Sequence, residues 1–184
     1  MPVSRRTQIL DTAAELFAER GFHGVSVHDI GAACGISGPA IYKHFSGKNA
    51  ILTESLTAIS QRHVAEAQDR RAKHHDLGDA LDALIAWHID FALEHPALIV
   101  IQEREWANLD APGRDTVRRL QLTYIDIWVD VVRGLRKDLD PAQARAVVQA
   151  TFGLLNSTPH SARISEQAMR DLLGPMARSA LLSG

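Results

Sequence analysis

Residues 26–48 read Ser-Val-His-Asp-Ile-Gly-Ala-Ala-Cys-Gly-Ile-Ser-Gly-Pro-Ala-Ile-Tyr-Lys-His-Phe-Ser-Gly-Lys, and this pattern predicts two short helices joined by a tight turn. Ser26 can cap the first helix, and Asp29 three residues later can complete a capping box. Gly35 stands where a left-handed residue would end that helix, and Ser37 can cap the next one. Two capped helices of about two turns each, joined in this way, form a helix-turn-helix.

The second helix of this pair has the composition of a helix that reads DNA. Its N-terminal half, residues 37–40, is small, and residues 42–44 add an aromatic ring and donors. A slim N-terminus can enter a major groove about 12 Å wide, while flanking donors reach phosphates. The amides that open the following helix favour an anion, and basic residues near the N-terminus can reach phosphates or a minor groove. The predicted DNA contacts are Arg5, Arg6, Ser26, Ser37, Gly38, Pro39, Ala40, Tyr42, Lys43, His44 and Lys48. Spacing alone leaves two alternatives open, an ordinary helical hairpin and a solvated basic terminus.

A longer pattern surrounds this segment. Its members are Ile9, Leu10, Ala13, Ala14, Leu16, Phe17, Arg20, Gly21, Phe22, Val27, Ile30, Gly31, Ala33, Gly35, Ile36, Ser37, Ile41, Tyr42, Lys43, His44, Phe45, Lys48 and Leu52. On these residues the stretch resembles the N-terminal domain of the TetR/AcrR family of transcriptional regulators, without gaps. Cys34 departs from the family's usual small apolar residue, and Asn49 from its usual acid. The resemblance implies a DNA-binding regulator that works as a homodimer on double-stranded operator DNA.

Composition limits the class of protein. The chain has 184 residues, 46% hydrophobic and 23% charged, with a net charge of −2 and one cysteine. These values are ordinary for a globular protein with a real core. The single cysteine excludes an internal disulfide and leads us to expect a cytoplasmic protein. We expect no membrane partner, because no apolar run approaches the roughly 20 residues of a spanning helix, and the N-terminus does not resemble a secretory signal.

Helical spacing runs through the rest of the chain, and no stretch indicates a strand. A first helix is expected over residues 4–20, and a long one from Gly47 into the seventies. Later helices are expected over residues 79–94, 97–106, 114–137, 141–156 and 166–182. The predicted fold is all-α, with about nine helices in total. Residues 1–48 would form the helix-turn-helix domain, and residues 49–184 a helical ligand-binding and dimerisation domain.

The last two predicted helices carry apolar residues on more than one face, which favours a partner surface over a fully internal core. In the family that this chain resembles, the last two helices form a four-helix interface with their two-fold mates. The predicted dimer residues are Val148, Phe152, Leu155, Met169, Leu172, Leu173 and Met176. A dimer also suits an operator, because two recognition helices about 34 Å apart read the half-sites of a palindrome.

The middle helices supply candidates for an effector pocket, because such pockets are mostly apolar with few polar anchors. The predicted lining residues are Trp87, His88, Phe91, Ile101, Arg104, Glu105, Trp106, Tyr124, Ile127, Trp128 and Asn156. For each of them, plain core packing is the alternative. Arg104 interrupts an apolar helix, so it can pair with a neighbouring acid or hold an anionic ligand group. This favours an amphipathic effector such as a fatty acid or an acyl-CoA.

Enzyme chemistry has little support in the sequence. It shows no glycine-rich phosphate loop, no paired carboxylates and no metal-ligand spacing, so we expect no catalysis, no cofactor and no metal. Cys34 with His28 or His44 could suggest a thiol nucleophile, but it stands inside the helix-turn-helix as a small packing residue. Two alternatives to a DNA-binding regulator stay open, a helical adaptor and a thiol-based redox sensor that uses Cys34.

Overall fold

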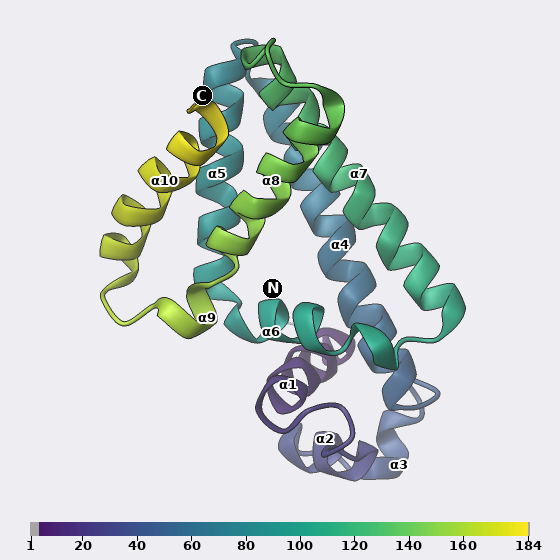
Figure 1. Cartoon of the computed structure of the whole chain (residues 1–184). Helices are drawn as coiled ribbons and strands as arrows, with labels where there is room; N and C mark the ends of the chain where they lie inside the picture. The colour runs from purple at the N-terminus through teal and green to yellow at the C-terminus, as the bar shows by residue number, and fades with distance from the viewer. Residues whose placement is uncertain (1–3, 184) are drawn as a thin grey trace. The chain divides into compact units, whose positions relative to one another are not determined.

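A computed structural model describes residues 4–183, which contain helices and no strand (Figure 1). The all-α class predicted from the sequence is confirmed. The elements are α1 (Arg5–Arg20), α2 (Val27–Ala33), α3 (Gly38–Ile41), α4 (Lys48–Lys73), α5 (Leu77–Glu94), α6 (Pro96–Arg104), the 3₁₀ helix η1 (Trp106–Asn108), α7 (Ala111–Leu135), α8 (Pro141–Leu155), α9 (Thr158–Ser161) and α10 (Glu166–Leu182). The one-turn helix α9 lies where the sequence predicted only a break.

The chain divides into two compact units that do not follow chain order. The first comprises Met1–Ser60 and Ala97–Arg119, and the second comprises Gln61–Pro96 and Leu120–Gly184. The helices α4 and α7 therefore each contribute residues to both units. The domain boundary after residue 48 stays a prediction.

The first unit is built around α1. The Ser4 hydroxyl caps this helix by accepting a hydrogen bond from the Thr7 amide, as predicted. Gly21 ends it with a φ of 72°, in the half of conformational space that favours glycine. The apolar stripe of α1 is fully buried at Ile9, Ala13 and Phe17, and it forms the core of the unit.

The turn between α2 and α3 is the Schellman turn that the sequence indicates. Gly35 has a φ of 66°, which confirms its left-handed conformation. The Ile36 amide donates to the Gly31 oxygen at 2.9 Å, and the Gly35 amide donates to the Ala32 oxygen at 3.1 Å. A Cβ added at Gly31 would lie 3.0 Å from the Ile36 oxygen and 3.1 Å from the Gly38 nitrogen. Only glycine at position 31 therefore lets the turn fold back so closely on α2.

The helix α3 is shorter than predicted. Its α-helical part is the four residues Gly38–Ile41, and tighter bonds follow, from the Lys43 amide to Ala40 and from the His44 amide to Ile41. Ser37 occupies the N-cap position, but its side chain makes no capping hydrogen bond. Glycine and proline at the first two positions favour only a short helix.

Two helix starts differ from the sequence expectation. Asp76 caps α5, because its Oδ1 accepts hydrogen bonds from the Gly78 and Asp79 amides, so Asp79 is not the cap and lies within the first turn. Similarly, Asp110 Oδ1 accepts from the Gly113 amide at 2.8 Å, and α7 begins at Ala111 instead of Arg114. In each case the side chain of an aspartate accepts hydrogen bonds from backbone amides two or three residues after it, and the helix begins at the residue that follows this aspartate.

In the second unit, α10 packs against both α5 and α8. Its inner face buries Met169, Leu173, Ala177 and Leu181. Over residues 4–183 no single helix has the length and apolar character needed to cross a membrane, although α5 and the bent continuation α6 reach that limit together by length and composition.

Candidate functional site

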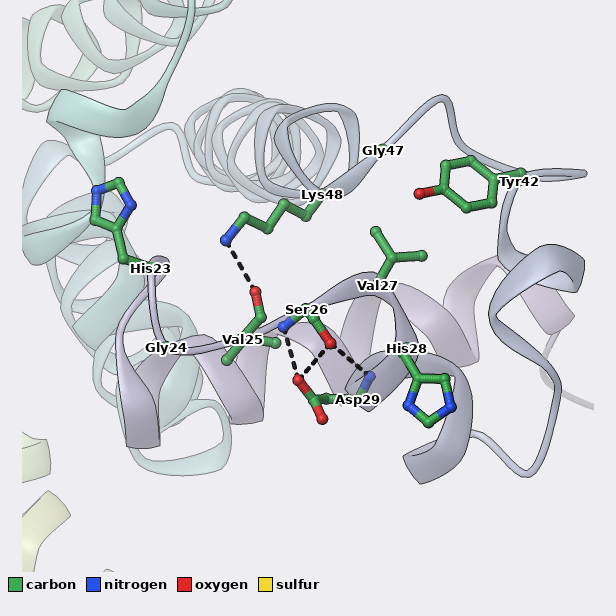
Figure 2. Close-up of a pocket in the computed structure, with 10 residues that line it drawn as sticks. All are labelled: His23, Gly24, Val25, Ser26, Val27, His28, Asp29, Tyr42, Gly47 and Lys48. Carbon is green, nitrogen blue, oxygen red and sulfur yellow. Dashed lines mark hydrogen bonds between the residues drawn. The ribbon is translucent and has the colours of Figure 1, made fainter.

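A hollow of about 630 Å³ opens on the surface of the first unit, beside the start of α2 (Figure 2). It is lined by His23, Gly24, Val25, Ser26, Val27, His28, Asp29, Tyr42, Gly47 and Lys48. Three short segments thus meet here, the α1–α2 turn, the end of the α3 segment and the first turn of α4. Three of the predicted DNA contacts, Ser26, Tyr42 and Lys48, line this hollow.

Ser26 and Asp29 form the predicted capping box. The Ser26 amide donates to Asp29 Oδ2 at 2.8 Å, and the Asp29 amide donates to Ser26 Oγ at 3.1 Å. The Ser26 hydroxyl also donates to Asp29 Oδ2 at 2.5 Å, and this bond, followed by the backbone bond, lowers the pKa of the Asp29 carboxyl. The hydroxyl of Ser26 is therefore engaged in holding α2, and its predicted role as a DNA contact stays a prediction.

Lys48 points inward. Its Nζ atom donates to the carbonyl oxygen of Val25 at 2.9 Å (Figure 2). It also donates to the carbonyl oxygen of Phe22 at 2.8 Å and lies 4.4 Å from the centre of the Phe22 ring. The ammonium group therefore ties the α1–α2 turn to α4. The phosphate contact predicted for Lys48 stays a prediction, as does anion binding by the leading amides of α4, which have no partner within the helix.

The two N-terminal arginines belong to the first turn of α1. Arg6 pairs with Glu54 through both carboxylate oxygens, donates to the His44 carbonyl oxygen at 2.5 Å and lies over the Phe45 ring at 4.2 Å. The bond to Glu54 is the main reason that the pKa of Arg6 rises above its ordinary value. Arg5 donates to Gln8 at 2.7 Å. Arg6 braces the helix-turn-helix through the His44 carbonyl oxygen, and Arg5 does so through a 3.5 Å hydrogen bond to the Cys34 carbonyl oxygen.

The α3 segment presents its side chains to solvent. Tyr42 is 59% exposed, Lys43 and Pro39 are exposed, and Ala40 and His44 are half-buried. Gly38 is buried instead, at the point where α3 approaches the backbone of α2: a Cβ added at Gly38 would lie 3.7 Å from the Cα of His28.

The sequence reasoning missed two residues beside the hollow. His23 and His28 are both exposed there, and neither was among the predicted contacts. Their place next to the capped start of α2 was the available signal. The single cysteine, Cys34, is buried at the end of α2, where reagents have little access.

The predicted effector residues fall into two groups. Ile101, Arg104, Glu105 and Trp106 belong to the first unit. There Arg104 is exposed and donates to the Ala18 carbonyl oxygen at 3.2 Å, while the buried Glu105 accepts from Asn108 at 2.7 Å. Arg104 thus makes a backbone contact, and its pairing with a neighbouring acid or an anionic ligand group stays a prediction.

The other predicted effector residues lie in the second unit. Their rings contact one another and the rings of two further residues, and we call this set of rings the aromatic cluster. It consists of His63, Trp87, His88, Phe91, Tyr124, Trp128 and Phe152. His88 Nδ1 is hydrogen-bonded to the Tyr124 hydroxyl at 2.9 Å, and His88 Nε2 to Asn156 Oδ1 at 2.9 Å. Ile127 is half-buried in the same unit.

His63 was not predicted, because it lies where α4 becomes polar. The signal was its spacing: Leu56, Ile59, His63 and Ala67 continue one buried stripe. Burial lowers the pKa of His88 to about 4 and places the pKa of His63 well below its ordinary value. Burial likewise raises the pKa of Tyr124. All three groups are therefore neutral near pH 7.

The residues predicted for dimerisation divide by exposure. Val148, Leu155, Met169 and Leu173 are buried inside the second unit. Phe152 is half-buried and belongs to the aromatic cluster. Leu172 and Met176 remain, 50% and 44% exposed on the outer face of α10. These two are the side chains that a partner would cover.

Comparison with known proteins agrees with this architecture. Residues 9–54 match the family "Bacterial regulatory proteins, tetR family", and residues 74–160 match "Tetracyclin repressor-like, C-terminal domain". Two similar relatives are named HTH-type transcriptional repressor KstR2. The one from Rhodococcus jostii RHA1 is 30% identical over 73% of this chain and 66% of its own length. The one from Mycolicibacterium smegmatis is 30% identical over 76% of this chain and 71% of its own length.

Solved structures share the fold. A TetR-family transcriptional regulator from Bordetella parapertussis 12822 has a TM-score of 0.87 at 21% identity, covering 97% of this chain and 94% of its own. FadR from Bacillus subtilis, solved in complex with stearoyl-CoA, has a TM-score of 0.70 at 21% identity, covering 97% of this chain and 98% of its own. With matched segments at both the helix-turn-helix and the helices that follow it, the chain belongs to the TetR family of bacterial regulatory proteins.

Proposed function

We propose that this protein is a ligand-responsive transcriptional repressor, which binds a palindromic operator as a homodimer and is released by a small apolar or amphipathic effector. The observation that carries the proposal is the exposed α3 segment. It stands on the capped helix α2 through the Gly35 turn, inside the stretch that matches the family.

On this proposal α3 enters the major groove. Pro39, Ala40 and Lys43, at the surface of the segment, read base edges, and Tyr42 and the first turn of α4 bind phosphates. Lys48 and Arg6 act indirectly, because their hydrogen bonds fix the turn before α2 and the end of the recognition segment.

Repression and an effector have separate support. The similar KstR2 proteins are named transcriptional repressors, and the similar FadR structure holds stearoyl-CoA. Within this chain, the aromatic cluster gives the second unit a buried apolar surface with a few polar atoms, which is typical of small-molecule sites. An effector releases DNA only if it binds better to the conformation that does not fit the operator.

The test is fluorescence anisotropy with a labelled duplex taken from the DNA upstream of the gene. We expect specific binding whose affinity falls steeply with salt, with a log–log slope of about −0.9 for each phosphate neutralised. Lys43→Ala should weaken binding, whereas Lys137→Ala, an exposed lysine of the second unit, should not.

Affinity for duplex DNA that hardly changes with salt would contradict the proposal and favour a helical adaptor. Sedimentation of the protein alone should give a dimer, and a monomer at micromolar concentration would contradict the palindromic arrangement. Deleting the gene should raise transcription from the bound promoter if the protein represses it.

A further inference from the structure

The aromatic cluster contains buried polar atoms that no described residue satisfies. His63 is 4% exposed and Trp128 is fully buried, yet within residues 4–183 neither His63 Nε2 nor Trp128 Nε1 has a partner at good hydrogen-bond geometry, although the Tyr124 hydroxyl lies close to Trp128. A buried polar group without a partner costs roughly 1–3 kcal/mol. Two such atoms on one cluster therefore suggest that a bound molecule completes it.

The hydrogen bonds already present fix which chemistry is still needed. Asn156 Oδ1 accepts, so His88 Nε2 carries the proton and the neutral His88 Nδ1 accepts from the Tyr124 hydroxyl. Both ring nitrogens of His88 and the hydroxyl proton of Tyr124 are thus already engaged in hydrogen bonds. Trp128 Nε1 can only donate, and neutral His63 Nε2 can donate or accept. A hydroxyl or carbonyl oxygen on a ligand can form a hydrogen bond with either atom.

The cluster is uncharged. Its polar members are neutral, because burial lowers the pKa of His88 and His63. The neighbouring cations lie against the outer rings, with Arg62 Cζ 5.6 Å from the centre of Phe91 and Arg70 Cζ 5.3 Å from that of Trp87. Arg70 is paired with Glu66, and Arg62 contacts His95 at 3.3 Å. Arg70 is thus held by Glu66, and a ligand carboxylate could meet Arg62 at the outer side of Phe91, but among the rings themselves it would be desolvated.

The rings that carry these polar atoms lie nearly parallel. His88 and Phe152 are 5.1 Å apart and inclined by 5°, Tyr124 and Phe152 are 5.3 Å apart and inclined by 14°, and His63 and Tyr124 are 5.0 Å apart and inclined by 24°. Offset stacks of this kind favour another flat ring over a flexible chain.

We infer that the aromatic cluster is the effector site and takes an uncharged, flat ring compound with a hydroxyl or carbonyl oxygen, bound by His63 Nε2 and Trp128 Nε1. This inference rests on the proposed effector response and narrows its chemistry. It separates the site from one built for the carboxylate of a fatty acid, which the sequence favoured.

Isothermal titration calorimetry at pH 7.5 without DNA tests the ligand class with four probes: 2-naphthol, naphthalene, 2-naphthoate and decanoyl-CoA. We expect 2-naphthol to bind at least about 10-fold more tightly than naphthalene or 2-naphthoate, since one buried hydrogen bond contributes about this factor. Decanoyl-CoA should bind more weakly still. Tighter binding of 2-naphthoate or decanoyl-CoA, or no binding of any probe at millimolar concentration, would overturn the inference.

Variants test the atoms. His63→Phe keeps a ring and removes Nε2, so 2-naphthol should bind about 10-fold more weakly while naphthalene changes little. Trp128→Phe should give the same pattern. His75→Phe, at an exposed histidine of the same unit, is the matched control and should change neither. Equal losses for both probes in His63→Phe would show a packing role only and overturn the assignment.

The same preparations are then titrated with the promoter duplex. Loss of DNA binding by the wild-type protein would sink the proposed repressor function, yet 2-naphthol binding would still support the site. Conversely, strong DNA binding with the probe order reversed would leave the repressor function standing and remove the ligand class.

Discussion

The ammonium group of Lys48 donates a hydrogen bond to the carbonyl oxygen of Val25 at 2.9 Å, and this bond joins the start of α4 to the residue just before the α2 cap. A lysine at the edge of a DNA-binding surface is usually assigned to phosphate. Here the ammonium group of Lys48 is hydrogen-bonded within the protein, to the carbonyl oxygens of both Val25 and Phe22.

Lys48→Met should therefore act on folding more than on charge. We expect the free energy of unfolding to fall by about 1–3 kcal/mol, because two carbonyl oxygens lose a charged donor. DNA affinity should fall with it, but the salt slope of binding should keep its wild-type value. Lys43→Met is the control, and it should alter the sequence preference of DNA binding without loss of stability. Urea unfolding and anisotropy measure the two effects; a reduced slope in Lys48→Met would mean that its ammonium reaches phosphate.

Gly31→Ala should disrupt the turn before the recognition segment. The new Cβ would meet backbone atoms of Ile36 and Gly38 at 3.0–3.1 Å, and backbone gives way less easily than a flexible side chain. We expect a loss of about 1–3 kcal/mol, with weaker DNA binding. Gly47→Ala, where nothing lies within 4 Å of the added Cβ, is the matched control and should be nearly neutral. Equal thermal midpoints for the two variants would refute the close approach.

Acid should destabilise the second unit through its buried histidines. The pKa of His88 in the folded protein, about 4, is below the ordinary value of 6.5, so the unfolded chain takes up the proton first as the pH falls. The free energy of unfolding is thus fully present above pH 6.5 and falls toward pH 4, by about 3 kcal/mol for His88 alone. The pKa of His63 is depressed in the same sense.

Denaturation at a series of pH values checks this histidine contribution. His88→Phe starts from a lower stability because Tyr124 and Asn156 lose their partner. Between pH 6.5 and 4 its free energy of unfolding should nevertheless decrease less steeply than that of the wild type. His75→Phe, which removes an exposed histidine, should keep the wild-type slope. Identical slopes in all three proteins would contradict the burial effect on His88.

The outer face of α10 should control the oligomeric state. A Leu172→Glu, Met176→Glu double variant places two charges on the exposed apolar positions of that helix, where a dimer would bury them. We expect a monomer by sedimentation and at least a 100-fold loss of operator affinity, since half-site binding no longer benefits from linkage. Ser179→Glu, at an exposed polar position of α10, should remain dimeric. A double variant that stays dimeric places the interface elsewhere.

Interactions between residues close together in the sequence account for the parts of the helix-turn-helix that were predicted correctly. The Ser26–Asp29 box and the positive φ of Gly35 depend on residues a few positions apart, and both are present. Helix lengths were less predictable, because Asp76 and Asp79 can each cap a helix start, and Asp76 caps α5 one turn earlier than the sequence predicted. Only the geometry of the turn decides which acid caps the helix.

The sequence did not predict toward which partners the side chains point. Lys48 and Arg6 look like surface cations, but their partners lie 23 and 48 residues away along the chain, at Val25 and Glu54. His63 was hidden for a related reason, since it belongs to a polar run of α4 and is buried only by its packing against rings from other helices. The aromatic residues of α5 and α7, together with His88, were visible in the sequence, but the addition of His63 to them was not.

The distribution of the tryptophans also decides how the protein can be observed. Trp106 belongs to the first unit, while Trp87 and Trp128 belong to the second. A Trp106→Phe protein would emit only from the half that holds the aromatic cluster, and a Trp87→Phe, Trp128→Phe protein only from the half that holds the helix-turn-helix. Intrinsic emission thus provides a separate optical reporter for each half without any attached dye.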